Sequence, residues 1–188
     1  MKCKVRANDL KRLVDNTKKF LGSAGYQKLM QYIYLEVDVE ENIVKATALN
    51  GYAVSEEYGM CVEADQSFSC FIKPNIPKIT KKDMYAEIEL INGKCYITVG
   101  ENIVGFVQPE GEYYKTHDMI LDWENTKPLA VVCMRKDLLL AAVQSLNHDY
   151  RQEVRIEIRE GKTPVIFRTD ANNTRYVLPF HNSNWEGK

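Results

Sequence analysis

Residues 3–22 read CKVRANDLKRLVDNTKKFLG and predict a short strand followed directly by a helix. The strand is expected over 3–6, and Asn8 is the expected N-cap of the helix, with Asp9 in its positively polarised first turn. The apolar stripe at helical spacing comprises Leu10, Leu13, Val14, Thr17 and Leu21. Gly22 is expected to end the helix. This stretch therefore predicts a strand that leads into an amphipathic helix covering one face of a sheet.

Strands joined by tight turns are predicted after this helix. Apolar and polar residues alternate over 33–39, which is the period of a half-buried strand. A turn over 40–42 leads into a second strand from Ile43, and Asn50-Gly51 precedes a third. The order of strand, helix and three strands defines one β-α-β-β-β module.

The same module recurs at a spacing of about sixty residues. In the second copy a strand is expected over 67–73, and Pro74 and Pro77 limit the helix to a short piece over 78–82. Asn92-Gly93 is a strong hairpin signal between its later strands. Each module is too short to bury its own apolar face, so neighbouring modules are expected to pack beside one another.

The third copy follows a polar and aromatic stretch, 110–128, that we interpret as a connector. A strand is expected over 130–134, and strands over 154–159, 165–168 and 175–180. The apolar stripe of its helix comprises Leu138, Leu139, Ala142, Val143 and Leu146. The predicted class is therefore α+β, with a two-module domain over 1–122 (modules about 1–62 and 66–109, then the connector) and a half domain over 128–182.

Composition describes a soluble globular protein, with 45% apolar and 27% charged residues among 188. The sequence contains no run of 18 apolar residues and does not start with the apolar stretch of a signal peptide, so a cytoplasmic protein without membrane contact is expected. The five cysteines form no Cys-x-x-Cys pair, which favours reduced core cysteines over disulfides or a zinc site. They are Cys3, Cys61, Cys70, Cys95 and Cys133.

Charge is distributed unevenly although the net charge is only −1. Lysines and arginines gather on the predicted helices, and acidic residues gather on strands and turns, which predicts two electrostatic faces. Lysines also solvate helix faces in proteins that bind no nucleic acid, so this pattern alone does not indicate a DNA-binding protein.

Catalytic motifs are absent from the sequence. There is no glycine-rich phosphate loop, nucleophile elbow or paired metal-ligand motif, and His117, His148 and His181 are far apart. We therefore expect no enzyme, no catalytic residue, no cofactor and no metal. An enzyme of unknown type would require titratable side chains that cluster in a cleft.

Three stretches resemble one known family. Residues 46–54, Ala-Thr-Ala-Leu-Asn-Gly-Tyr-Ala-Val, resemble an Ala-Thr-Asp-Gly-His-Arg-Leu-type stretch in the middle domain of the bacterial DNA polymerase III beta subunit, the sliding clamp. Residues 111–114 resemble its Gly-Arg-Phe-Pro segment, and 154–180 resemble its carboxy-terminal strands, which end in Val-Met-Pro-Met. The family's Asp, His and Arg are replaced here by Asn50, Tyr52 and Ala53.

This resemblance implies a clamp-like fold with helices on one face and antiparallel sheets on the other. It implies a processivity factor for DNA replication that contacts or encircles duplex DNA without reading its sequence. The implied DNA contacts are Lys11, Arg12, Lys18, Lys19, Lys78, Lys81, Lys82, Arg135, Lys136 and Arg151. A ring in that family holds twelve modules, so chains of three modules would form a homo-oligomer, most simply a tetramer.

The resemblance also implies a hydrophobic pocket for short, apolar-anchored peptides of polymerase, loader or repair proteins. Its implied walls are Leu49, Gly51, Tyr52, Val54, Leu178, Pro179 and Phe180. These residues could equally be core and edge residues of two neighbouring modules. A second reading of the chain remains open: a clamp-derived peptide-binding or regulatory module that does not encircle DNA.

Overall fold

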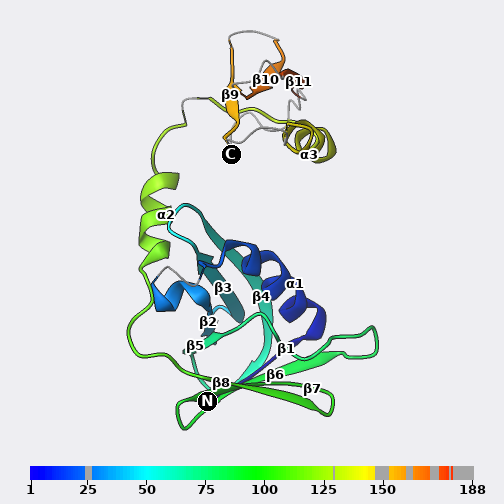
Figure 1. Ribbon diagram of the computed structural model, residues 1–188. Helices are drawn as coiled ribbons and strands as arrows, with labels where there is room; N and C mark the ends of the chain where they lie inside the picture. The colour runs from blue at the N-terminus through cyan, green and yellow to red at the C-terminus, as the bar shows by residue number, and fades with distance from the viewer. Residues whose placement is uncertain are drawn as a thin grey trace. The chain divides into compact units, whose positions relative to one another are not determined.

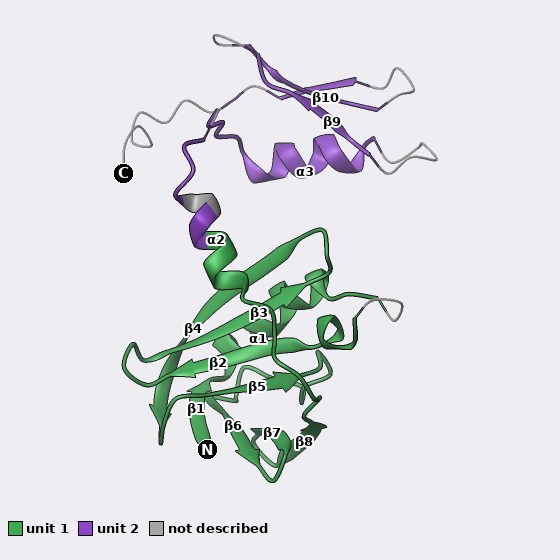
Figure 2. Cartoon of the chain, turned by 90° about the vertical axis from the view of Figure 1, so that its left-hand side faces the viewer, with its two compact units in different colours: residues 1–120 green, residues 121–188 purple. Residues whose placement is uncertain are grey.

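The computed structural model of the chain describes residues 1–23, 27–128, 130–146, 153–159, 163–169, 174–177 and 179. The chain divides into two compact units, Met1–Ile120 and Leu121–Lys188, which are coloured separately in Figure 2. Each unit has a hydrophobic core of its own.

The described residues of unit 1 form one α-helix, packed on a large antiparallel sheet, and the start of a second (Figure 1). Its elements are β1 (Lys2–Arg6), α1 (Ala7–Thr17), the 3-10 turns η1 (Lys18–Phe20) and η2 (Lys28–Gln31), β2 (Ile33–Asp38), β3 (Ile43–Leu49), β4 (Val54–Ala64), β5 (Phe68–Ile72), β6 (Tyr85–Ile91), β7 (Lys94–Val99), β8 (Asn102–Val107) and the first turns of α2 (Thr116–Glu124).

The eight strands follow the order β5-β2-β3-β4-β1-β6-β7-β8. The first strand of each module pairs with the second strand of the other, because β1 pairs with β6 and β5 pairs with β2. The two edge strands are bridged by a side chain: Gln108 Oε1 accepts the Phe71 N–H at 2.7 Å, and Gln108 Nε2 donates to the Phe71 carbonyl at 3.0 Å. The two modules of unit 1 are therefore interlocked.

The core of unit 1 lies between α1 and the sheet, where four residues of the predicted stripe are buried; the fifth, Leu21, lies beyond the helix and is partly buried. β2 shows strict alternation of buried and half-buried residues, which confirms the predicted strand. The core includes Val5, Leu10, Leu13, Val14, Ile33, Leu35, Val44, Ile72, Ile88 and Ile97. Four of the five cysteines are buried, and all five are free thiols.

The predicted start of α1 is wrong by two residues. The helix begins at Ala7 with Arg6 at the N-cap position, and Asn8 lies inside the first turn. The Ala7 N–H donates to the Met84 carbonyl at 3.1 Å, so a backbone group distant in sequence replaces a capping side chain. At its other end the helix tightens into η1 before reaching Gly22.

The short helix predicted over 78–82 is not formed. Thr80 and Asp83 instead close a local turn, in which the Asp83 carboxylate accepts both the Thr80 N–H and its hydroxyl at 2.7 Å. Such side-chain bonds compete with helical ones, and Pro77 removes a further backbone donor. Ile76 and Ile79 still pack against the core, so this segment covers the core without being helical.

The stretch 110–128, interpreted as a connector, contains α2. Thr116 at its start is buried, and the Thr116 hydroxyl donates to Glu56 on β4 at 3.5 Å. Asp118 in the first turn suits the helix dipole. The prediction from the sequence missed this helix, although Met119, Ile120 and Trp123 are spaced as one helical face.

After the end of α2, the described residues of unit 2 form a single small module with α3 (Lys136–Gln144), β9 (Arg155–Glu157), β10 (Val165–Arg168) and β11 (Thr174–Val177). The strands follow the order β11-β10-β9, and α3 packs on one face of this sheet. Its core comprises Ala142, Leu146, Val165, Phe167 and Val177. The strand predicted over 130–134 is not formed, since these residues pair with no strand among those described.

Candidate nucleic-acid interface

The exposed face of α1 and η1 carries four of the predicted DNA contacts. Lys11, Lys18 and Lys19 are exposed, and Lys19 has no acidic partner among the described residues. Asp15 accepts from both Lys11 and Lys18, at 2.6 Å in the case of Lys18. The Lys11 and Lys18 ammonium groups lower the pKa of Asp15, so this carboxylate stays ionised and offsets part of the positive charge.

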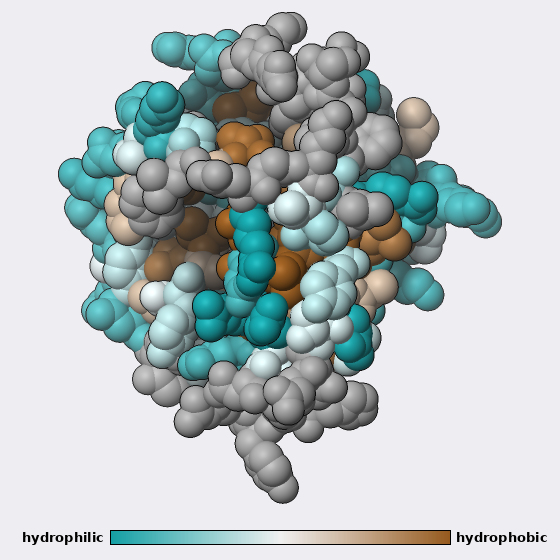
Figure 3. Space-filling view, turned by 90° about the horizontal axis from the view of Figure 1, so that it is seen from above, coloured by the Kyte–Doolittle hydropathy of each residue, from teal (hydrophilic) through white to brown (hydrophobic). Residues whose placement is uncertain are grey.

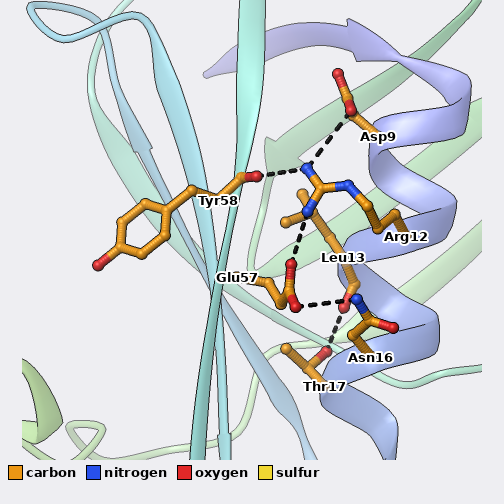
Figure 4. A network of polar contacts seen from close by, with 7 residues as sticks. All are labelled: Asp9, Arg12, Leu13, Asn16, Thr17, Glu57 and Tyr58. Atoms are coloured by element: carbon orange, nitrogen blue, oxygen red, sulfur yellow. Dashed lines mark hydrogen bonds and ion pairs between the residues drawn. The ribbon is translucent and has the colours of Figure 1, made fainter. Parts of the chain in front are cut away.

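The fourth of these residues, Arg12, extends from α1 toward β4 (Figure 4). Its guanidinium lies 2.6 Å from Glu57 Oε2 and donates to the Tyr58 carbonyl at 2.5 Å. Asn16 completes the contact by donating to Glu57 Oε1 at 2.9 Å. Tyr58 pairs with β3 on one side, whereas β1 reaches only as far as Cys61 on the other. Arg12 therefore supplies a donor to a stretch of β4 that has only one neighbouring strand.

A second basic group lies on the segment between β5 and β6. Lys78, Lys81 and Lys82 are all exposed there, on irregular backbone rather than on a helix. The end of this segment adjoins the start of α1 through the Ala7–Met84 hydrogen bond. The two basic groups of unit 1 are thus carried by adjoining segments.

In unit 2, Arg135 and Lys136 are exposed at the start of α3, and Arg135 Nε donates to Asp137 at 3.1 Å. Arg151 lies outside the described residues. The sequence-based prediction did not include a group of three arginines around Glu157. These are Arg155, Arg159 and Arg168, at 3.2, 2.8 and 3.2 Å. The alternation over 154–159 places two of these arginines and Glu157 on one face, which was a usable signal.

The Arg159, Arg168 and Arg155 side chains together lower the pKa of Glu157, with the Arg159 hydrogen bond the largest cause. Three cations around one ionised carboxylate leave a net positive patch on this sheet face.

Part of the predicted peptide pocket lies at the turn between β3 and β4. Leu49 and Val54 are cross-strand partners, and the Asn50 side chain accepts the N–H groups of the two residues after Gly51 at 3.0 and 2.9 Å. Gly51 has a φ of 85°, a conformation that favours glycine, and Tyr52 is 87% exposed. Leu178 and Phe180 lie outside the described residues, and Pro179 belongs to unit 2. The pocket therefore stays a prediction.

The segment that resembles Gly-Arg-Phe-Pro packs on the outer face of the sheet. Tyr113 stacks on Tyr34 of β2 with ring centroids 4.7 Å apart and planes 19° apart, and it also contacts Phe71. Burial raises the pKa of the Tyr113 phenol. This segment anchors the chain to unit 1 just before α2.

Among the described residues no group of three or more His, Cys, Asp or Glu side chains is placed to hold a metal ion. Within the same part of the chain, no helix has the length and apolar character needed to cross a membrane.

Comparison with known proteins gave matches only among solved structures, since no family model and no curated protein matches the chain. A structure described as a DNA polymerase III beta subunit from Eubacterium rectale matches 95% of this chain at 15% identity, with a TM-score of 0.75. A DNA polymerase sliding clamp from Pseudomonas aeruginosa matches 97% at 13% identity, also with a TM-score of 0.75. The chain has the sliding-clamp fold. The resemblance drawn from the sequence is thereby confirmed for the fold, as is the α+β class.

The chain spans about half the length of these clamps, 50% of the Eubacterium rectale chain and 52% of the Pseudomonas aeruginosa chain. A Helicobacter pylori beta clamp matches 96% of this chain and 52% of its own, at 14% identity and a TM-score of 0.61. That clamp was solved bound to a DNA ligase peptide.

Proposed function

We propose that this chain is a non-catalytic, clamp-like protein of DNA replication that contacts duplex DNA through its phosphate groups. The observation that carries the proposal is the clamp fold over 95% of the chain, combined with exposed lysines on α1, η1 and the adjoining segment. Lysines contact phosphates without reading bases, as a protein that moves along DNA requires.

The charge balance of α1 favours weak contact over tight binding. Asp15 partly neutralises Lys11 and Lys18, and Arg12 is engaged with Glu57. Loose, screened attraction to phosphate permits sliding, because no single contact holds the protein at one position. The candidate phosphate contacts of unit 1 are Lys11, Lys18, Lys19, Lys78, Lys81 and Lys82.

We further propose that the turn between β3 and β4 belongs to a pocket for short apolar peptides. The peptide-bound Helicobacter pylori clamp supports this part, because it has the same fold. The exposed Tyr52, together with Leu49 and Val54, would contribute apolar surface from unit 1. Partner proteins would then be tethered by two or three anchors of about 1.5–3 kcal/mol each.

One observation favours the second candidate function, a clamp-derived module that binds peptides without encircling DNA. The second module has no helix over 78–82, so it would contribute no helix to the lining of a ring. The two functions differ in one property: the ring form binds duplex DNA in a salt-dependent way, and the regulatory form binds peptide alone.

Two variants with the same change in net charge test DNA binding. In the first, Lys11, Lys18, Lys78 and Lys82 are replaced by Ala. In the second, the exposed Lys28, Lys94, Lys115 and Lys127, which belong neither to α1 nor to the 73–84 segment, are replaced by Ala.

The first variant should bind every duplex more weakly. Its slope of log affinity against log salt should flatten by about 0.9 for each phosphate that the protein no longer neutralises. The second variant should keep most of the wild-type slope of log affinity against log salt. Equally weakened binding in both variants would show general charge attraction, and no binding by the wild-type chain at low salt would favour the regulatory module.

A further inference from the structure

From its helix onward, unit 2 has the same order of elements as the first module of unit 1: a helix and then three strands. Arg6 and Arg135 are the N-cap residues of α1 and α3, with φ and ψ of −64° and 132° and of −66° and 131°. When these arginines are aligned, Leu13 corresponds to Ala142, and both are buried under the sheet of their own unit. The two helices therefore occupy the same place in their modules.

In unit 1 each module is completed by the other. β5 of the second module lies beside β2, and β1 lies beside β6. The inward residues of β2 are consequently shielded from water: Ile33, Leu35 and Val37 are 0%, 0% and 3% exposed.

In unit 2 the same positions are uncovered. β9 corresponds to β2 and lies at the edge of its sheet among the described residues. Ile156 is 56% exposed and Ile158 is 52% exposed, although their alternation is that of a buried strand face. Val143 of α3 is 37% exposed, whereas its counterpart Val14 is 2% exposed. Figure 3 shows hydrophobic residues, in brown, on the surface seen from above.

The segment 130–134 of unit 2 also lacks its partner. It corresponds to β1, and Val132 and Met134 pack against the core as Cys3 and Val5 do. In unit 1, β1 is held on one side by β6 of the other module. No described strand takes the place of β6 in unit 2, and 130–134 also does not pair with β11, the counterpart of the β4 strand that holds β1 on its other side. Unit 2 thus offers both an unpaired strand-forming segment and an unpaired sheet edge.

We propose that two copies of this chain complete each other through unit 2. Residues 130–134 of one copy pair antiparallel with β9 of the other, and the reverse pairing forms at the same time. Each copy carries both complementary halves, which is the requirement for a twofold, self-complementary interface.

The pairing of β1 with β6 sets the register. Cys3 lies opposite Ile88 and Lys4 lies opposite Glu87. Ile88 and Ile156 are each the middle one of three alternating apolar residues, 86/88/90 and 154/156/158, so Ile156 is aligned with Ile88. Transferred to unit 2, the register then places Val132 opposite the partner's Ile156 and Cys133 opposite the partner's Arg155. The exposed apolar residues of β9 and α3 then leave water, which is the driving force for association.

Pairing through unit 2 does not depend on DNA binding, and its tests contain no DNA. Failure of DNA binding would leave it unaffected, and failure of pairing would leave open DNA contact by unit 1. Two such pairs would also supply the four chains that a twelve-module ring requires.

A single substitution tests the register. Arg155→Cys should place a thiol opposite the native Cys133 of the partner, and directly opposed strand residues have Cα atoms about 4.5–5.5 Å apart, within disulfide range. Oxidised glutathione takes up two electrons and two protons as the two thiols join, and leaves as two molecules of reduced glutathione. A covalent dimer should become the major species on a non-reducing gel.

Two controls make this result specific. Arg168→Cys places a thiol on the same sheet face but one strand further from the interface, beyond bridging distance, and should give little dimer. The double variant Arg155→Cys with Cys133→Ser should give equally little covalent dimer, because it lacks the opposing thiol. If Arg155→Cys gives no more covalent dimer than Arg168→Cys, the proposal is overturned.

Solution mass gives an independent test. The wild-type chain should be at least dimeric at micromolar concentration, and Ile156→Asp should halve its mass. Because Ile156 is 56% exposed in the single chain, this variant should keep its fold, which circular dichroism checks. Tyr176→Asp, at a 65% exposed position on β11, is the matched control and should keep the wild-type mass. A monomeric wild-type chain overturns the proposal.

Discussion

Arg12→Ala separates a structural role of this arginine from a role in DNA binding. The substitution removes the guanidinium that joins α1 to Glu57 and to the Tyr58 carbonyl, at 2.6 and 2.5 Å. It also removes the weaker ion pair with Asp9 at 3.5 Å. Asn16 still donates to Glu57, so only part of the network in Figure 4 is removed.

The expected loss of stability in Arg12→Ala follows from how exposed the two side chains of the ion pair are. The Arg12 side chain is 44% exposed and that of Glu57 is 26% exposed, so the ion pair itself is worth about 0.2–1 kcal/mol. The hydrogen bond from the charged guanidinium to the Tyr58 carbonyl adds about 1 kcal/mol, because water replaces part of it in the variant. The total of about 1–2 kcal/mol should lower the Tm of unit 1 by roughly 3–10 °C.

Hydrogen exchange measured by mass spectrometry is the best assay, because it reports on α1 separately from unit 2. Amides of α1 should exchange about 5–30 times faster in Arg12→Ala than in the wild-type chain. Lys19→Ala is the matched control, since it removes one positive charge from the adjoining η1 without breaking an ion pair among the described residues. Lys19→Ala should change the free energy of unfolding by no more than about 0.5 kcal/mol.

Unchanged α1 exchange in Arg12→Ala, together with a flatter salt dependence of DNA binding, would refute a structural role for this arginine. That combination would make Arg12 a phosphate contact. A double substitution with Glu57→Ala adds a further check, because the two single effects should not be additive if the side chains interact as described.

Asp15→Asn should strengthen duplex DNA binding at low salt by about two- to tenfold, since it frees Lys11 and Lys18, and a titration that shows weaker binding would contradict this. The same carboxylate has a lowered pKa in the folded chain, so its stabilising contribution is present above its unfolded pKa and is lost as pH falls through the folded value. The difference in unfolding midpoint between wild type and Asp15→Asn should therefore shrink below about pH 4, as urea denaturation across pH can measure. Leu178→Asp should abolish binding of a clamp-binding peptide, expected near micromolar Kd or about −8 kcal/mol, while leaving DNA affinity unchanged in fluorescence anisotropy. Loss of both activities would instead indicate a folding defect.

Local signals in the sequence were sufficient for the elements that depend on local interactions. The alternation over 33–39 is confirmed by β2, and the Asn92-Gly93 hairpin is confirmed by positive φ at both residues. These features rest on side-chain periodicity and turn chemistry, which neighbouring residues determine.

Elements that depend on distant residues could not be predicted in the same way. The start of α1 depends on the Met84 carbonyl, and the absence of a strand over 130–134 depends on a missing partner strand. The role of Arg12 is set by β4, some 45 residues later in the chain. Of the candidate sites, the sequence located the exposed lysines of unit 1, but it could not show that Asp15 partly neutralises two of them.

The affinity of the wild-type chain for two duplexes of unrelated sequence, measured across a salt series, tests the proposed DNA binding most directly. We predict equal affinities for both duplexes and a linear fall of log affinity with log salt, with a slope of about −0.9 for each phosphate contacted. Affinities that differ between the two sequences, or no binding at the lowest salt concentration, would contradict sequence-independent contact with the phosphate backbone.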